Sequence, residues 1–132
     1  MRGISVVGIG LCLWIVAPAM AEETLKLPDG AKELKGADII ALYDGSIVKW
    51  VNVSANGTGI ALYDLKGQKQ HVIYDFGDKK GTFSGRIRVK ADNFCYTPPK
   101  VKEVCVIVFT DGDDIYEVDK DHVVLSKNRK IQ

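Results

Sequence analysis

The sequence is poor in cysteine and histidine and has no excess of charge of either sign. Its 132 residues include three Cys and two His. A tetrahedral zinc site needs four ligands, and these residues are too few and too scattered to supply one. Lys and Arg total 18, while Asp and Glu total 17. This balance argues against a nucleic-acid-binding domain, which would carry a strong basic excess. We therefore expect neither a cofactor nor a nucleic-acid partner.

The chain also lacks an apolar run that could cross a bilayer. The apolar stretch near the N-terminus, Ile4–Val16, is shorter than the about 18–20 residues that a membrane-spanning helix requires. Arg2 precedes this stretch, and Pro18 and Ala19-Met20-Ala21 follow it. This order is typical of a secretory signal peptide with an A-x-A cleavage site. We predict that residues 1–21 are a signal peptide and that the mature protein is periplasmic or secreted, without a transmembrane segment.

Two cysteines remain once Cys12 is removed with this leader. Cys95 and Cys105 flank Thr97-Pro98-Pro99-Lys100, a turn signal between two β-prone segments. A dithiol oxidoreductase would need Cys-x-x-Cys near the start of a helix, and this spacing differs. Oxidising compartments favour disulfides, so we predict one disulfide between Cys95 and Cys105, across adjacent antiparallel strands.

Ahead of these cysteines the mature chain divides into a lead-in and one domain. Residues 22–36 are predicted to be an extended lead-in with a turn at Pro28-Asp29-Gly30. Residues 37–132 are predicted to form a single β-rich domain that begins with a short helix, Ala37 to Asp44. A helix of two turns is not stable alone in water. We expect it to pack on the outer face of the strand Val104–Phe109 or to close one end of the sheet.

After Gly45 the pattern changes to short β-prone runs separated by turn residues. Short connections allow only antiparallel neighbours. The fold class is therefore predicted to be mainly β, an antiparallel meander of about eight short strands that forms a small, lipocalin-like barrel or a curled sheet, with one short N-terminal helix. The predicted strands are 46–54, 58–65, 69–76, 82–90, 93–97, 102–110, 114–118 and 122–128.

Two of these strands have informative patterns. Apolar or small residues alternate with polar ones over Thr82–Lys90, which predicts one buried and one exposed face. Val104–Phe109 is apolar on both faces, which predicts a strand covered on both sides. The basic stretch Lys127–Lys130 at the C-terminus is typical of a solubilising end.

A barrel of this size is either filled by its own side chains or holds one small ligand. In the second case we expect the ligand to be lined by the aromatic and apolar residues Trp50, Tyr74, Phe83 and Ile87. Core packing is an alternative interpretation of Trp50, and it is the more usual one for a large aromatic residue in a small β-domain.

An acidic stretch begins at Asp111 and is the only weak candidate for a metal site. Asp111, Asp113 and Asp114 are spaced like calcium ligands, but Ile115 and Tyr116 then occupy positions where an EF-hand requires a ligand and a glycine. Asp and Gly are also preferred turn residues. We therefore expect tight turns here rather than bound metal.

Several short segments together resemble a known family. They are Leu27-Pro28-Asp29-Gly30-Ala31-Lys32, the helix ending Leu42-Tyr43-Asp44-Gly45, Trp50, the segment Gly81–Val89, and Cys95-Tyr96 with Cys105. The chain resembles a family of small exported proteins, found mainly in alphaproteobacteria and defined only as a domain of unknown function. The resemblance implies a periplasmic, disulfide-bearing, sheet-rich domain, and it implies no catalytic residues.

These observations predict an exported, non-catalytic envelope protein. Its partner would be a small apolar ligand, held in the barrel, or an envelope protein or polymer, held on a strand face. The alternative is a metal-assisted enzyme or a calcium-binding protein that uses the Asp111–Asp121 carboxylates. General acid–base chemistry needs carboxylates that converge in a cleft, whereas turn carboxylates normally point into water. The first interpretation is therefore favoured.

Overall fold

The structure, a computed structural model, describes residues 25–53 and 56–132. The predicted signal peptide lies outside these residues. The elements are β1 (Lys32–Glu33), α2 (Gly36–Tyr43), β2 (Ile47–Asn52), β3 (Gly57–Asp64), β4 (Lys69–Asp75), β5 (Lys80–Lys90), β6 (Asn93–Thr97), β7 (Val104–Asp111), β8 (Asp114–Val118) and β9 (Val124–Lys130). None of the helices in the described part of the chain has the length and apolar character that a membrane span requires.

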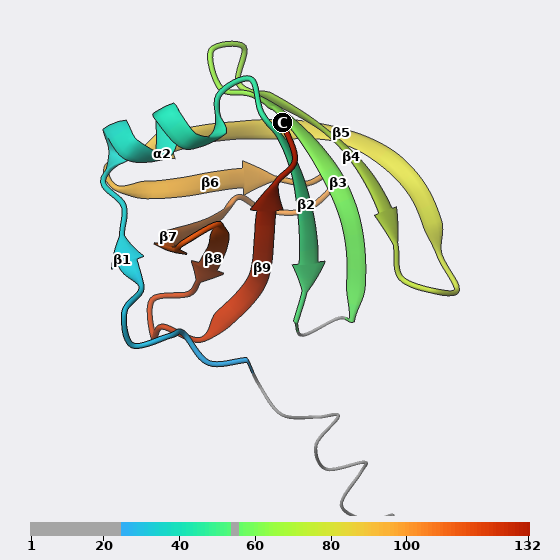
Figure 1. The fold of residues 1–132 in the computed structure, drawn as a ribbon. Helices are drawn as coiled ribbons and strands as arrows, with labels where there is room; N and C mark the ends of the chain where they lie inside the picture. The colour runs from blue at the N-terminus through green and yellow to red at the C-terminus, as the bar shows by residue number, and fades with distance from the viewer. Residues whose placement is uncertain (1–24, 54–55) are drawn as a thin grey trace, which may run out of the picture.

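Strands β2 to β9 form a closed antiparallel barrel (Figure 1). Each strand pairs with the next one along the chain, and β9 pairs with both β8 and β2. The ring is completed at the C-terminus, where the backbone N–H of Ile47 donates to the carbonyl oxygen of Gln132 at 3.0 Å. The predicted meander of eight strands is confirmed, and of the two predicted shapes the chain adopts the barrel.

The helix α2 closes one end of this barrel, which was one of its two expected positions. It lies over β5 and β6, as Figure 1 shows. Ile39 and Tyr43 point into the core and are fully buried. At the start of the helix, the Gly36 N–H donates to the side chain of Asp92 in the β5–β6 turn at 2.8 Å. The helix is thus attached to the barrel at its first residue as well as along its buried face.

The strand β7 is covered on both faces from Val106 to Phe109, whereas Cys105 is exposed, and the helix does not provide the outer cover. Val106 and Val108 belong to the main core inside the barrel. On the outside, Phe109 belongs to a second cluster with Tyr116, Val118 and Val124, against which Leu27 and Ala31 pack. The lead-in therefore covers this face, and it adds the short strand β1, which pairs with β7. An extended segment of few residues gave no sequence signal strong enough to predict that strand.

The last strand ends two residues later than predicted, at Lys130. Lys127–Lys130 was interpreted as a solubilising end, but these residues lie in β9, which pairs with β2 and β8 on its two sides. Asn128 is buried inside the barrel, Lys127 beside it is partly exposed, and Arg129 and Lys130 are exposed. The basic character therefore belongs to the outer face of a strand that the barrel needs for closure.

Candidate functional site

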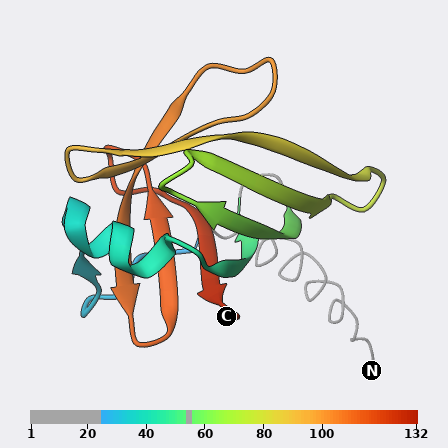
Figure 2. The ribbon, with the colours of Figure 1, turned by 90° about the horizontal axis from the view of Figure 1, so that it is seen from above.

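The barrel encloses a cavity of 290 Å³. Its lining combines aromatic and apolar side chains with a smaller number of polar ones. The lining residues are Trp50, Asn52, Ala61, Tyr63, Gln70, Val72, Tyr74, Phe76, Phe83, Tyr96, Pro98, Glu117, Ser126 and Asn128. Trp50, Tyr74 and Phe76 are only partly buried, so the cavity meets solvent on their side. Figure 2 shows the β4–β5 hairpin, which follows Tyr74, reaching away from α2.

Three of the four predicted lining residues surround this cavity. Trp50 comes from β2, Tyr74 from β4 and Phe83 from β5. Ile87, the fourth, is not among the lining residues. It lies further along β5 toward the helix, is 1 % exposed and belongs to the main core. The prediction for Ile87 was therefore wrong, because alternation along a strand identifies its inner face but not the depth of each residue in the barrel.

Glycines on neighbouring strands make room for the aromatic rings at the cavity. Trp50 lies opposite Gly59 in the β2–β3 pairing, and a Cβ atom at Gly59 would overlap the indole ring. A Cβ atom at Gly57 would overlap the ring of Phe76 in the same way. Glycines in strands often mark such close approaches. These missing side chains allow large rings to lie flat against the wall, which keeps the cavity open.

Three polar residues form the opposite side of the cavity, toward the helix. Glu117 projects inward from β8, and Ser126 and Asn128 project inward from β9. All three are buried, with exposed fractions of 6 %, 8 % and 2 %. We call these three residues the polar floor. Tyr43 of α2 contacts it from the closed end of the barrel.

Every hydrogen-bond donor of these side chains is directed at the carboxylate of Glu117 or at Tyr43. The Tyr43 hydroxyl donates to Glu117 Oε2 at 2.7 Å. Asn128 Nδ2 donates to the same oxygen at 3.1 Å and to the Tyr43 hydroxyl oxygen at 3.3 Å. Ser126 Oγ donates to Glu117 Oε1 at 3.3 Å. Asn128 Oδ1 is buried and has no hydrogen-bond partner in the part of the chain that the structure describes.

Burial dominates the electrostatics of this group. Removal of the Glu117 carboxyl from water raises its pKa, and the hydrogen bonds from Tyr43, Ser126 and Asn128 oppose that shift. The pKa values of the Tyr43 and Tyr63 hydroxyls are raised well above the ordinary tyrosine value by burial and by the nearby Glu117. The same two causes raise the pKa of Tyr96 to about 12. No cationic side chain of the described residues pairs with Glu117; the recorded ion pairs lie elsewhere.

The polar floor was not predicted from the sequence. Glu117 was interpreted only as one member of the acidic stretch after Asp111. The alternation of β8 does contain the signal, because Glu117 shares a face with the buried Ile115. The pairing of Glu117 with Ser126 depends on which strands are neighbours and in which register, and neither is visible in a single sequence.

The weak metal candidates do not assemble into a site in the described residues. Asp111 and Asp113 are exposed beside Gly112 in the β7–β8 turn. Asp114 forms ion pairs with Arg129 at 2.8 Å and with Lys127 at 3.8 Å. The Arg129 guanidinium, through its hydrogen bond, holds the pKa of Asp114 below its usual range. Asp114 thus takes part in ion pairs between β8 and β9.

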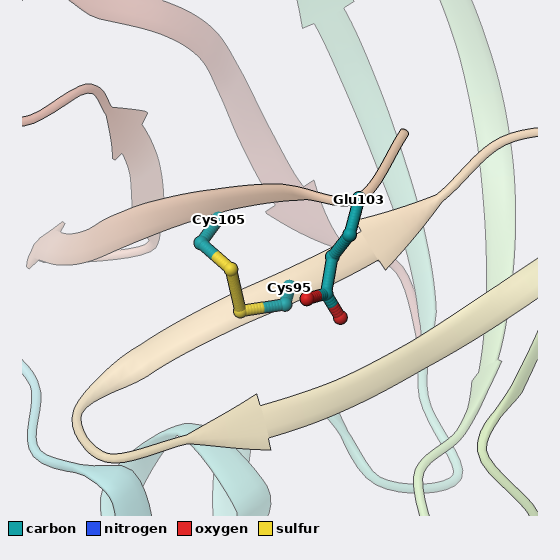
Figure 3. Close-up of side chains that lie close together, drawn as sticks. All are labelled: Cys95, Glu103 and Cys105. Carbon is teal, nitrogen blue, oxygen red and sulfur yellow. A yellow bond between two sulfur atoms is a disulfide. The ribbon is translucent and has the colours of Figure 1, made fainter. Parts of the chain in front are cut away.

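Cys95 and Cys105 form the predicted disulfide, on directly paired positions of β6 and β7. Figure 3 shows the carboxylate of Glu103 beside the two sulfur atoms. Within the described residues these three side chains are the one group close enough to hold a metal ion. The sulfur atoms are bonded to each other and offer no thiolate, and both Glu103 oxygens accept hydrogen bonds from Arg88 at 2.7 Å. The group is therefore a covalent link beside an ion pair.

Comparisons with known proteins add no information on this site. No family model, curated protein or solved structure matches the chain. The resemblance to a family of exported proteins of unknown function therefore stays a prediction, and the function has to be inferred from the barrel itself.

Proposed function

We propose that this protein is an exported, non-catalytic binding protein that holds one small molecule inside its barrel. The observation that carries the proposal is the cavity of 290 Å³, which has aromatic walls on one side and a buried polar floor on the other. Ligand pockets are typically apolar clefts with a few fixed polar groups that orient the ligand. Typical pockets have volumes of about 300–1,000 Å³, so this cavity has the size for a single small molecule.

The polar floor supports a binding role because its geometry is fixed. Glu117 is held through both oxygens by three donors, two from strand β9 and one from the helix. Such a network orients a carboxylate precisely, at the cost of burying it. The apolar wall would contribute affinity and the polar floor would contribute orientation.

The disulfide supports the export part of the proposal. A structural disulfide persists in the periplasm or outside the cell, whereas the cytosol keeps thiols reduced. Cys95 is fully buried, and its bond to Cys105 joins adjacent strands of the barrel. An oxidising compartment is the environment in which this covalent link forms.

The experiment is a titration with N-phenyl-1-naphthylamine, a neutral apolar probe whose emission rises on leaving water. The variant Tyr74→Ala removes one cavity wall. Ile73→Ala, one residue earlier in β4, is the matched control because Ile73 points outward and is 52 % exposed. An aromatic contact is worth about 0.5–1.5 kcal/mol, so Tyr74→Ala should weaken binding of the probe by roughly 2- to 10-fold. Ile73→Ala should leave it unchanged.

Two outcomes of this titration would contradict the proposal. The probe fails to bind the wild-type protein, or the two variants weaken its binding equally, which would place the probe outside the barrel. Native mass spectrometry of protein purified from its own cell envelope provides an independent check, because a retained small molecule would add its mass to the folded barrel.

A further inference from the structure

The hydrogen-bond donor atoms of the polar floor are engaged within the group. Asn128 Nδ2 and the hydroxyls of Ser126 and Tyr43 each donate to an acceptor in it. A hydroxyl has one donor hydrogen and an amide NH₂ group has two. What the floor still has to offer is acceptor capacity, namely the remaining lone pairs of the Glu117 carboxylate and of Ser126 Oγ.

The orientation of Asn128 follows from the same network. The opposite placement of its amide group would direct Oδ1 at the Glu117 carboxylate, so that two acceptors would face each other. With Nδ2 directed at Glu117, Asn128 Oδ1 is left as a buried acceptor without a partner among the described residues. The polar floor therefore combines a carboxylate with an unpartnered acceptor. An anionic head group would be repelled there.

The polar floor also contains a carboxylate and no positively charged side chain. The buried polar residues of the described chain are Ser46, Gln70, Glu117, Ser126 and Asn128, and none of them is basic. A buried carboxylate is normally paired with a cation or neutralised. Tyr43, Tyr63 and Tyr96 face Glu117 from α2, β3 and β6, and they too supply no positive charge.

We propose that the ligand is a small amine, with its protonated amino group at the polar floor next to Glu117 and its apolar body between the aromatic walls. This inference rests on the proposed function and adds the chemical class of the ligand. The ammonium group supplies a positive charge for the unpaired Glu117 carboxylate and a donor for the unpartnered Asn128 Oδ1. Aromatic faces also attract cations, and Trp50, Tyr74 and Tyr96 line the cavity.

The test uses three probes with the same naphthyl body and different heads: 1-naphthylmethylamine, 1-naphthalenemethanol and 1-naphthoic acid. Their affinities for the full mature protein are measured by isothermal titration calorimetry at neutral pH. Hydrogen bonds to charged groups are stronger than neutral ones by enough to change affinity about tenfold. We expect the amine to bind about tenfold more tightly than the alcohol, and the acid to bind more weakly than both.

The variant Glu117→Gln identifies the group responsible. It should abolish the preference for the amine over the alcohol and leave affinity for the alcohol nearly unchanged. Glu33→Gln is the matched control, since Glu33 is an exposed residue of β1 and its substitution changes the net charge equally. Glu33→Gln should retain the full preference. On the wild-type protein, lowering the pH until Glu117 is protonated should weaken amine binding and leave alcohol binding constant.

The outcomes separate this inference from the proposed function. If none of the three probes binds, the proposed function fails. If all three bind with equal affinity, or the acid binds most tightly, the barrel binds small molecules but the inference about amines is wrong. An amine preference that persists in Glu117→Gln would also overturn it. If that variant does not fold, the comparison of the three probes on the wild-type protein and its pH dependence still decide the matter.

Discussion

At the scale of single residues, Glu117 links the stability of this barrel to its proposed function. Its side chain is buried and accepts hydrogen bonds from Tyr43, Ser126 and Asn128. An apolar residue at this position would avoid the cost of taking a carboxyl group out of water. A buried ionisable side chain that lowers the stability of the fold and faces a cavity is more typical of a functional residue than of a structural one.

The pH dependence of stability tests the burial of Glu117. Because its pKa is raised in the folded state, the folded protein binds this proton more tightly than the unfolded chain does. Its contribution to the free energy of unfolding is therefore largest below the ordinary glutamate pKa of about 4.3. That contribution is lost as the pH rises through the raised folded-state pKa. Urea unfolding at a series of pH values measures the free energy of unfolding of wild type and of Glu117→Gln. We expect the stability of the wild type relative to the variant to fall as the pH rises.

The comparison with Glu117→Gln removes the opposing contributions of other acids. Asp114 and Glu103 have lowered pKa values because of Arg129 and Arg88, so they stabilise the fold at higher pH in both proteins. A difference that did not vary with pH would show that Glu117 is not desolvated in the folded state.

At the scale of elements, the helix α2 acts as a lid fixed over one end of the barrel. Its two turns place Ile39 and Tyr43 in the core, while Ile40 is 46 % exposed. Both isoleucines lie in the same helix and have the same intrinsic helix propensity. The pair therefore separates the contribution of packing from that of helix formation.

Substitution of the two isoleucines by alanine should give very different results. Ile39→Ala leaves a cavity in the core and is expected to lower the free energy of unfolding by about 2–5 kcal/mol. Ile40→Ala removes an exposed side chain and should change stability by about 0.5 kcal/mol or less. Urea unfolding monitored by Trp50 fluorescence measures both. Equal effects would show that the helix does not pack on the barrel.

How far the sequence predicts each element depends on whether its signal is local. The alternation of Phe83, Gly85 and Ile87 and the turn residues between strands are local, and they predicted all eight barrel strands and the helix. The strand β1 has two residues and exists only because β7 offers an unpaired edge beyond the end of β6. The polar floor brings together residues such as Tyr43 and Asn128, which are 85 positions apart. No periodicity within one segment reports such a contact.

At the scale of the whole molecule, closure of the barrel depends on pairing between its first and last strands. The pairing of β2 with β9 joins residues such as Val48 and Lys130, so the ring is complete only when nearly the entire chain has folded. This closure pairs the two edges that an open sheet of β2 to β9 would leave free to associate with other chains. The disulfide between β6 and β7 adds a covalent link on the opposite side of the ring.

Loss of this disulfide should reduce the stability of the whole molecule without changing its fold. The bond closes a short loop, with a sequence separation of 10, and is expected to contribute about 2–3 kcal/mol. The double variant Cys95→Ser, Cys105→Ser should therefore melt roughly 10 °C lower than the oxidised wild type, as measured by circular dichroism. Reductant should lower the melting temperature of the wild type and have no effect on the double variant. Identical melting temperatures for oxidised wild type and double variant would show that the bond contributes nothing.

The glycines beneath the aromatic rings have a consequence for how this barrel could diversify. Trp50 and Phe76 occupy their positions because Gly59 and Gly57 carry no side chains. A methyl group added at Gly57 would displace the Phe76 ring, whereas one added at Gly59 would meet both the Trp50 ring and the backbone oxygen of Ile73. Under the proposed function, selectivity for the size of a guest molecule and recognition of its head group would depend on separate positions, the glycines and Glu117.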